Sequence, residues 1–308
     1  MRGYLSRRAL LTVPVLLGTT FVIYFAVFQL PGDPIQALVG PGQSISPSVA
    51  RELRARYHLN EPLLSQYAHY LDGIAHGDFG VSLHGEPVSH IIATSWPVTL
   101  KLGLTAWMFE AILGPLLGTI AAVRRGKLTD VAILSTTVLV VGIPYFVIAY
   151  VAQIVFGLEL GWFPVSGTSA GWPASYVLPG FVLALLGLAP LTRLTRASVL
   201  ENLRADYIDT AVTKGLSPLR IVGKHVLRNS LIPVLTVLGV DLGYLLGGTV
   251  LIEGIFNLPG IGYQVFVGIQ QHDGPVVVGI STLMVLIFVI VNLLVDLLYG
   301  VLDPRVRS

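Results

Sequence analysis

Long, uninterrupted apolar runs constrain this 308-residue chain more than any other feature. A helix needs about 20 apolar residues to cross the ~30 Å hydrocarbon layer of a membrane, and shorter apolar runs suffice for soluble cores. Charged residues make up 12% of the chain, well below the roughly one quarter that is usual in soluble proteins. The mean hydropathy is +0.77. These features predict an all-α, polytopic membrane protein, because only helices or closed barrels span lipid. Six runs are long enough to span, at 9–30, 98–123, 131–157, 176–191, 231–255 and 276–302.

The first run follows a basic start, "MRGYLSRR", which is also typical of secretory signals. Its apolar stretch is longer than the roughly 7–15 residues of a signal peptide, and no small-residue cleavage site follows it. We therefore expect residues 1–30 to be kept as an N-terminal span.

Lysines and arginines are distributed unequally between the loops. If the chain crosses six times, 15 of its 19 Lys and Arg residues fall on one side. The positive-inside rule makes this side cytoplasmic, so we expect both termini there. The outer side carries Arg51, Arg54, Arg56 and, at its margin, Lys101. The cytoplasmic positions are Arg2, Arg7, Arg8, Arg124, Arg125, Lys127, Arg193, Arg196, Arg204, Lys214, Arg220, Lys224, Arg228, Arg305 and Arg307.

The first outer loop, 31–97, contains two segments with apolar residues at helical spacing, "SPSVARELRARYHL" and "EPLLSQYAHYLDGIAHGDFG". Each opens with a helix-start signal, so we expect two short amphipathic helices on the outer surface. His69, Asp72 and His76 would share one face of the second helix, where a metal site is conceivable. A solvated polar face is the more ordinary interpretation, and we predict no metal site.

Several kinds of chemistry are excluded. The chain has no cysteine, so it has no disulfide, thiol nucleophile or thiolate metal site. It has no H-E-x-x-H and no G-x-x-x-x-G-K-[ST], and therefore no Walker A loop of its own. The stretch "GTSAG" (167–171) fits a nucleophile elbow, but it lies in a Gly/Ser-rich loop between spans and is expected to be a turn. A net charge of +2 does not indicate nucleic acid. We predict no catalytic residue and no cofactor in this chain.

The carboxylates considered within the apolar runs are Glu110, Asp241 and Asp296. Charges there are costly, so each indicates a translocation path or a structural pairing. Asp296 lies about two turns from the cytoplasmic end, where it can reach water. Three roles stay open for Glu110 and Asp241: a proton-coupling pair, a lining for a cationic substrate, or partners of polar side chains. Small residues also recur at a four-residue spacing that favours close helix packing: Gly114 and Gly118, then Gly239, Gly243 and Gly247.

The cytoplasmic loop between the fourth and fifth runs, 193–230, is unusually long and polar. Its centre reads "DTAVTKGLSPLRIVGKHVLRN" (209–229). Thr210 and Ala211 are small, so a partner's backbone could approach them closely. Gly215 can adopt a positive φ and end a helix, and Ser217-Pro218 is a start signal for a second helix. We predict a helix, a stop and a second helix, which simple membrane orientation does not require.

The segment "DTAVTKG" resembles the E-A-A-x-x-x-G signature of ABC-importer permeases, with Asp for Glu and Thr for the first Ala. Further blocks match the peptide-importer branch of that family in order along nearly the whole chain. They are "FQLPGDP", "YHLNEPLLSQYAHYL", "GDFGVSL", "FNLPGIG" and "VNLLVDLLYGVLDPRVR". The chain therefore resembles an inner-membrane permease of the dipeptide/oligopeptide/nickel class.

This resemblance implies a type I importer permease fold with a cytoplasmic coupling helix that docks on an ATPase subunit. It implies one permease domain over 1–308: an N-terminal span (1–30), an outer loop (31–97), and a core (98–308) with the coupling segment 193–230. It also implies a homologous second permease, two cytoplasmic ATPase subunits that use Mg-ATP, and an external substrate-binding protein. The expected location is the bacterial inner membrane. The docking residues carried over are Asp209, Thr210, Ala211 and Gly215, followed by Leu216 and Ser217.

The resulting hypothesis is ATP-driven import of short peptides, without bond chemistry in this chain. A proton-driven secondary transporter using Glu110 and Asp241 is the alternative from another class. Import of nickel or another small solute is the alternative within the same class. Asp241 departs from the apolar or amide residues that the family more often has there, so its role is open.

Overall fold

A computed structural model describes residues 2–28, 46–56, 60–247 and 249–302 of the protein. The described residues are almost entirely helical, and no strand occurs among them, which confirms the all-α prediction. The elements are α1 (Arg2–Phe28), α3 (Pro47–Arg56), α4 (Leu63–Ala75), α5 (Val88–Val123), α6 (Leu128–Gly142), α7 (Tyr145–Ala152), η1 (Gln153–Glu159), α8 (Ala174–Asn202), α9 (Asp206–Thr213), α10 (Pro218–Arg220), η2 (Ile221–Val226), α11 (Leu227–Gly247), α12 (Val250–Phe256), α13 (Ile261–Gln270) and α14 (Gly274–Leu302).

Four helical stretches are long and apolar enough to cross a membrane: Val88–Val123, Ala174–Asn202, Pro218–Gly247 and Gly274–Leu294. Two bent helix pairs raise this number to as many as six if each pair forms one span. The expected run 9–30 corresponds to α1, whose apolar part Thr12–Phe28 is shorter than the other spans. The structure thus confirms a polytopic membrane protein.

The run expected as one span over 131–157 is sharply bent. Helices α6 and α7 meet at an angle of 99°. Ile143 has an extended backbone conformation (φ −100°, ψ 127°) and is followed by Pro144. Proline disfavours the helical conformation in the residue before it, which explains why α6 ends there. Pro144 in the sequence marks where the helix breaks, but the sequence does not indicate the angle between α6 and α7.

The run expected over 231–255 is divided between two helices, so the expectation of one continuous span there is wrong. Helix α11 ends at Gly247, and α12 begins at Val250. The sequence at this break, Gly247-Gly248-Thr249, has low helix propensity. Helix α12 then turns by 80° into α13. The chain therefore makes a short bent hairpin before α14.

Helices α5 and α8 pack in direct contact at two glycines of α5. A Cβ atom at Gly114 would lie 2.5 Å from Leu191 Cδ2, and one at Gly118 would lie 2.6 Å from the Thr192 carbonyl oxygen. No side chain larger than hydrogen fits at these distances. The close helix approach expected from the spacing of Gly114 and Gly118 is confirmed.

The two helices expected in the outer loop are present as α3 and α4. Helix α4 is fixed to the first and last long helices by its tyrosines. The hydroxyl groups of Tyr67 and Thr20 on α1 are 2.7 Å apart, and the Tyr70 hydroxyl donates to Thr282 on α14 at 2.5 Å. Burial raises the pKa of the Tyr70 phenol. The outer helix is thus part of the packed structure.

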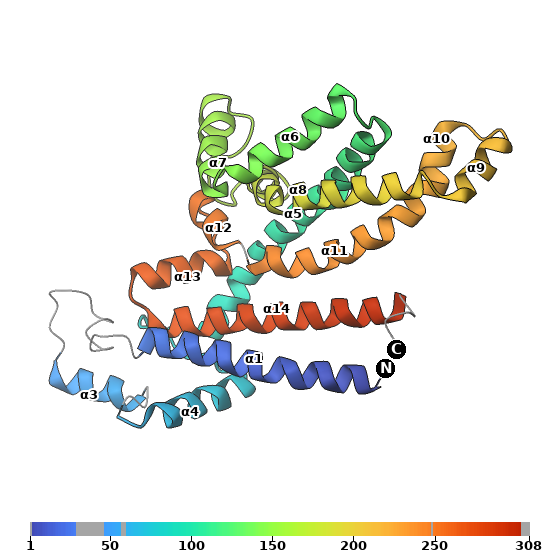
Figure 1. Cartoon of the computed structure of the whole chain (residues 1–308). Helices are drawn as coiled ribbons and strands as arrows, with labels where there is room; N and C mark the ends of the chain where they lie inside the picture. Colours follow the sequence, from blue (N-terminus) through green and yellow to red (C-terminus); the bar gives the residue numbers. More distant parts are fainter. Residues whose placement is uncertain (1, 29–45, 57–59, 248, 303–308) are drawn as a thin grey trace.

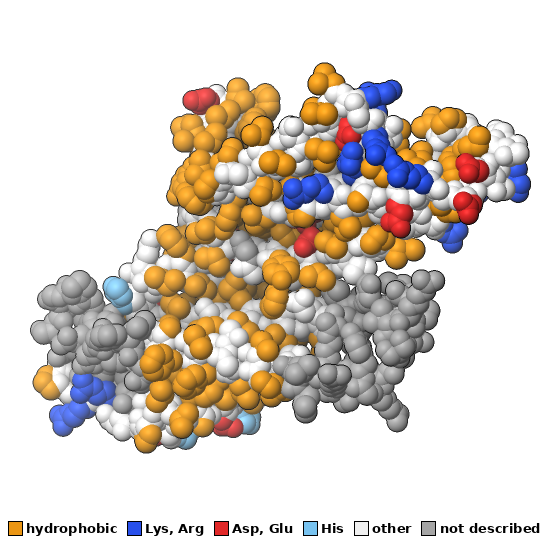
Figure 2. Space-filling model, viewed as in Figure 1, with side chains coloured by type: hydrophobic (Ala, Val, Ile, Leu, Met, Phe, Trp, Pro, Cys, Tyr) orange, Lys and Arg blue, Asp and Glu red, His pale blue; other side chains and the backbone are white. Residues whose placement is uncertain are grey.

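Helices α1 and α14 lie side by side. The N-terminal end of α1 and the C-terminal end of α14 lie at the same end of the molecule as α9 and α10 (Figure 1). Hydrophobic side chains cover much of the visible body of the molecule. Lys and Arg side chains gather towards the α9–α10 end, with a smaller group over α3 at the opposite end (Figure 2). This distribution agrees with the orientation expected from the loops.

Candidate functional site

The coupling segment has the predicted helix–stop–helix geometry. Helix α9 ends in a left-handed Gly215 with φ +73°. The Gly215 N–H donates to the Val212 carbonyl at 2.8 Å, and the Leu216 N–H donates to the Ala211 carbonyl at 3.2 Å. These two bonds form a Schellman motif, which satisfies the last carbonyls of the helix. Gly215 supplies the conformation that other residues adopt only with strain.

The second helix continues directly into the membrane. Ser217 occupies the N-cap position and Pro218 the first helical position, as predicted, although the Ser217 side chain makes no capping hydrogen bond. Residues Pro218–Gly247 form one continuous helical stretch through α10, η2 and α11. A displacement of α9 and α10 can therefore be transmitted to α11 without an intervening loop.

Ala211 does not lie on the exposed face of α9. Its side chain is buried together with Ile208, Ile221 and residues near the C-terminal ends of α5 and α8. The small size of Ala211 therefore serves packing within the chain, and the expectation that it leaves room for a partner is wrong. Of the other carried-over residues, Asp209, Thr210, Gly215 and Ser217 are exposed, and Leu216 packs beside the buried cluster.

Two apolar side chains of the coupling segment project into solvent. Val212 is 59% exposed and Leu219 is 87% exposed. Val212 lies on α9 and Leu219 on α10, the helices at the end of the molecule where the basic side chains gather (Figures 1 and 2). Covering two such apolar side chains with a partner protein would be favourable, so the pair is a candidate docking surface. Sequence reasoning missed both residues, because the family signature does not include them.

An ion pair fixes the neighbouring turn. The Arg196 guanidinium on α8 donates to both carboxylate oxygens of Asp130 at 2.7 and 2.8 Å. The Gly126 N–H donates to the same carboxylate at 2.9 Å. Arg196 therefore has a structural partner beyond its role in orienting the chain. The pair ties the α5–α6 turn to the helix that leads into the coupling segment.

A fully buried carboxylate, Glu253, holds the bent hairpin together. Thr99 on α5 donates to its Oε1 at 2.6 Å, and the Tyr263 N–H donates to its Oε2 at 2.8 Å. Thr99 also accepts the Ile261 N–H at 2.9 Å. A Cβ at Gly260 would overlap the Glu253 carboxylate. The sequence "FNLPGIG" thus wraps a carboxylate at the N-terminus of α13, where negative charge is stabilised.

Sequence reasoning also missed Glu253, although it lies within the run 231–255. Glu253 lies near the end of that run and was therefore not counted among the carboxylates inside it. Its partner on α5, Thr99, is 154 residues away in the chain, so the pairing could not be predicted from sequence spacing.

Glu110 and Asp241 lie on α5 and α11. Glu110 is fully buried, and neither carboxylate oxygen has a hydrogen-bond partner. Asp241 is partly exposed, with Oδ2 buried and unpartnered. Glu110 thus makes no hydrogen bond with a polar side chain of the described residues. The side chain of Asp296 lies outside the described residues.

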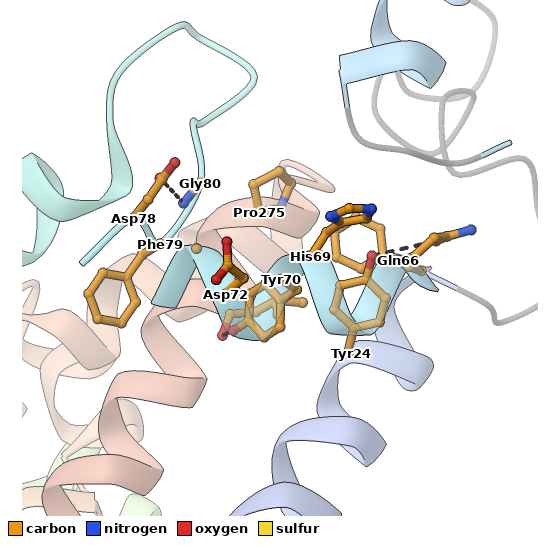
Figure 3. A pocket seen from close by; sticks show the side chains of 12 residues that line it. Tyr24, Gln66, His69, Tyr70, Asp72, Asp78, Phe79, Gly80 and Pro275 are labelled. Carbon is orange, nitrogen blue, oxygen red and sulfur yellow. Dashed lines mark hydrogen bonds between the residues drawn. The ribbon is translucent and has the colours of Figure 1, made fainter. Parts of the chain in front are cut away.

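An outer pocket of about 300 Å³ lies between α1, α4, the Asp78–Gly80 turn and the start of α14. Figure 3 shows aromatic rings and carboxylates around it, with Asp78 accepting the Gly80 N–H at 2.9 Å. Aromatic faces and carboxylates together favour cationic groups. The pocket includes part of the block "GDFGVSL"; the residues 29–45, which hold most of "FQLPGDP", lie outside the described residues.

The alternative chemical sites gain no support. His69 lies 3.2 Å from Glu61, and His76 lies 3.7 Å from Asp72. Within the described part of the chain, no three His, Asp or Glu side chains are close enough to hold a metal. Ser169 of "GTSAG" lies in a turn between η1 and α8, as expected, and not after a strand.

Curated relatives match this chain over its full length. It is 37% identical to a di/tripeptide transport system permease protein, DppB, of Pseudomonas aeruginosa, over 100% of this chain and 99% of the relative. It is 38% identical to the dipeptide permease protein DppB of Bacillus subtilis (100% and 98%). It is 35% identical to the oligopeptide permease protein OppB of Haemophilus influenzae (100% of each).

Two family models divide the chain between them. The N-terminal model of binding-protein-dependent transport system membrane components matches residues 1–103. The model of the binding-protein-dependent transport system inner membrane component matches residues 114–308, which include the coupling segment and the bent hairpin. The chain belongs to the family of binding-protein-dependent transport system inner membrane components, the permeases of ABC importers.

Proposed function

We propose that this chain is the membrane-spanning permease subunit of an ATP-driven importer of short peptides, and that α9 and α10 dock on an ATPase subunit. The names of its full-length relatives support the peptide substrate. The observation that carries the docking role is the exposed pair Val212 and Leu219 on a helix–turn–helix that continues into α11. The chain itself contains no Walker A motif.

In this proposal, the free energy that drives transport is supplied on the cytoplasmic side of the membrane. Two ATPase subunits bind Mg-ATP, close together and displace the coupling segment. Helix α11 moves with it because Pro218–Gly247 is one helix, and α8 moves because it leads directly into α9. ATP binding on one subunit thereby biases a two-state equilibrium of another. A homologous second permease completes the path.

The outer face has the complementary role. An external binding protein delivers the peptide to the outer loop, including α4 and the pocket beside it. Helix α4 is hydrogen-bonded to both α1 and α14, so a displacement of the outer loop can be transmitted to these two long helices. The chain contributes binding surfaces and a path, while the ATPase subunits carry out hydrolysis. In this proposal, both termini lie in the cytoplasm of a bacterial cell.

A matched pair of leucine substitutions tests the docking surface. Leu219→Ser removes the most exposed apolar side chain of the coupling segment, whereas Leu128→Ser removes a leucine that is 84% exposed at the start of α6. Docking anchors are worth about 1 kcal/mol or more, so the first change is expected to weaken ATPase binding about fivefold or more. The second should leave it unchanged. Binding is measured by co-purification of the ATPase subunits with the permease pair.

The docking proposal is wrong if both variants retain the ATPase subunits equally. Import of nickel or another small solute instead of peptides would show as a binding protein that does not bind peptides. Uptake by this chain alone, driven by a pH gradient, would support the secondary-transporter alternative.

A further inference from the structure

Glu110 differs from the other buried acids of the described chain. Glu253, Asp130 and Asp273 each accept at least two hydrogen bonds, from hydroxyl, guanidinium or backbone donors. Glu110 is 0% exposed, and both of its carboxylate oxygens lack any hydrogen-bond partner. The protein thus supplies donors to three buried carboxylates and none to the fourth. A charged carboxylate without donors is the costliest state of such a group in an apolar interior.

The surroundings of Glu110 leave little space. Its carboxyl group lies directly on the backbone of α8 at Gly187, where a Cβ atom would overlap it. On the α11 side, the hydrogen bond from Trp107 to the Leu238 carbonyl joins α5 to α11 one turn from Glu110 and one turn from Asp241. Asp241 has one buried, unpartnered oxygen and is otherwise partly exposed. A hydrated metal ion or an organic ammonium group does not fit between a carboxyl group and a backbone in contact.

No cation of the described helices compensates the pair. Lys101 lies nine residues from Glu110 along α5, about 13 Å at the rise of an α-helix. On α8, Arg193 lies six residues from Gly187, about 9 Å away along the axis, and Arg196 is already bound to Asp130.

The remaining helices against α5 add no cation near the pair. Helix α13 has no charged residue, and α6 has only Asp130. Glu253, beside α13, is held by its own donors. On α11 the nearest cation to Asp241 is Arg228, thirteen residues or about 20 Å away. The side chain of Asp296 on α14 is not described.

We propose that Glu110 and Asp241 form a proton-binding site between α5, α8 and α11, and that Glu110 holds the proton in this conformation. The proton comes from water through the partly exposed Asp241 and bonds to a lone pair of the Glu110 carboxylate, which becomes a neutral carboxylic acid. Its release regenerates the carboxylate and returns the proton to water. Complete burial of the carboxyl group excludes water and so stabilises the neutral form.

The site links protonation to helix arrangement. Trp107 on α5 donates its indole N–H to the Leu238 carbonyl on α11 at 2.8 Å, one turn from Asp241. Separation of α5 from α11 would admit water to Glu110 and favour release of the proton. Because α11 continues into the coupling segment, pH is expected to bias the same equilibrium that ATP biases. This last consequence rests on the proposed function, whereas the proton site does not.

Infrared spectroscopy of the purified chain tests the site independently of transport. A protonated buried carboxyl group gives a carbonyl-stretch band that is distinct from those of carboxylates and that shifts in D₂O. The band is expected at neutral pH in the unchanged protein and in the control Glu159→Gln, which alters an exposed acid. It should be absent in Glu110→Gln. Asp241→Asn should change the pH at which it disappears.

The same variants in the complete transporter separate this proposal from the proposed function. With its sibling permease, ATPases and binding protein, the unchanged protein is expected to show pH-dependent peptide uptake, and Glu110→Gln a flatter profile. The pH dependence of peptide binding by the binding protein is measured separately, and the uptake rates are corrected for it. Glu110→Met, an apolar substitute of similar length, is expected to fold and behave like Glu110→Gln.

Two outcomes would overturn the proposal. The first is a carbonyl band that is unchanged in Glu110→Gln and Glu110→Met. The second is loss of a carboxylate band in Glu110→Gln in place of the carbonyl band, which would show that Glu110 is ionised at neutral pH. A transporter without ATP-driven uptake but with the Glu110 band intact would contradict the proposed function alone.

Discussion

Thr99 connects two helices and a loop through a single hydroxyl group. It donates to Glu253 at 2.6 Å and accepts from the Ile261 N–H at 2.9 Å, and all of these atoms are buried. Because water cannot replace either bond, the hydroxyl determines whether the Glu253 carboxylate and the first turn of α13 are satisfied. The geometry of the bent hairpin therefore depends on one small side chain of α5.

Thr99→Val is expected to destabilise the protein by about 1–3 kcal/mol, because it removes one donor and one acceptor and leaves buried polar groups unpaired. The measurement is the unfolding free energy or the midpoint of thermal unfolding of the chain in detergent. Thr99→Ser keeps the hydroxyl group and serves as the control. Equal stability of the two variants would mean that the hydroxyl does not support the hairpin.

Single residues also show which features of the site could be predicted from the sequence. Gly215 was identifiable because a helix stop needs a residue that tolerates positive φ, and it has φ +73°. Ala211 was identifiable as part of the signature, but not the direction in which it points. That direction depends on Ile208, Ile221 and two other helices, which come together only in the folded chain. The Arg196–Asp130 pair was likewise invisible, because 66 residues separate its members.

At the scale of elements, contact between helix backbones fixes the arrangement of α5 and α8. Gly118 faces the Thr192 carbonyl oxygen and the Thr195 Cβ so closely that an added methyl group would lie 2.6 and 2.5 Å from them. One of these contacts is backbone, which cannot rotate away. The spacing of the glycines predicted close packing, but not which helix would be the partner.

Gly118→Ala is expected to destabilise the chain by about 1–3 kcal/mol, the usual cost of inserting a methyl group into a packed interior. Gly18→Ala is the control, since nothing lies within 4 Å of a Cβ there. Replacing a helical glycine by alanine in open space stabilises by roughly 0.5–1 kcal/mol. Opposite signs in thermal unfolding are predicted; a neutral Gly118→Ala would contradict the contact.

The turn after α9 is an element whose shape can be changed without a steric clash. A Cβ at Gly215 meets nothing within 4 Å, so any effect of substitution there arises from its positive φ. Left-handed geometry costs ordinary residues about 1–2 kcal/mol, and β-branched residues are the least suited to it. Asparagine tolerates it better.

Gly215→Val is therefore expected to distort the α9–α10 turn and to lower ATP-dependent uptake by about tenfold, the equivalent of roughly 1.4 kcal/mol. Gly215→Asn should retain most of the activity. Uptake and ATPase stimulation are measured together in the reconstituted transporter. Full coupling in Gly215→Val would show that the turn geometry is not needed.

Helix existence was readable from the sequence more reliably than helix direction. Apolar length located α5, α8 and α14, and start signals located α3 and α4. The 99° bend between α6 and α7 and the 80° bend between α12 and α13 could not be read. Proline and glycine mark where a helix can break, but the angle follows from the side chains that the next segment packs against.

At the scale of the whole molecule, the positive-inside rule and the fold agree. One end of the molecule holds the coupling segment, the α5–α6 turn, the N-terminal end of α1 and the C-terminal end of α14 (Figure 1). Helices α3 and α4 lie at the other end. Basic side chains are concentrated at the first of these ends (Figure 2). This arrangement requires the two ends to face opposite sides of the membrane.

The absence of cysteine from the sequence makes this orientation directly measurable. A cysteine at exposed Glu86, before α5, is expected to react with a membrane-impermeant maleimide in cells whose outer barrier has been opened. A cysteine at exposed Leu219 should react only after the inner membrane is permeabilised. Labelling of both, or of Leu219→Cys alone, before permeabilisation would contradict the proposed topology.

The central claim is that ATP hydrolysis on partner subunits drives peptide import through this chain. The most direct measurement is uptake of a labelled dipeptide into proteoliposomes that contain this chain, its sibling permease and the two ATPase subunits, with the binding protein outside and Mg-ATP inside. The account predicts uptake that requires ATP and the binding protein and that falls when Leu219 is replaced by serine. Uptake by this chain alone under a pH gradient, without ATP, would contradict it.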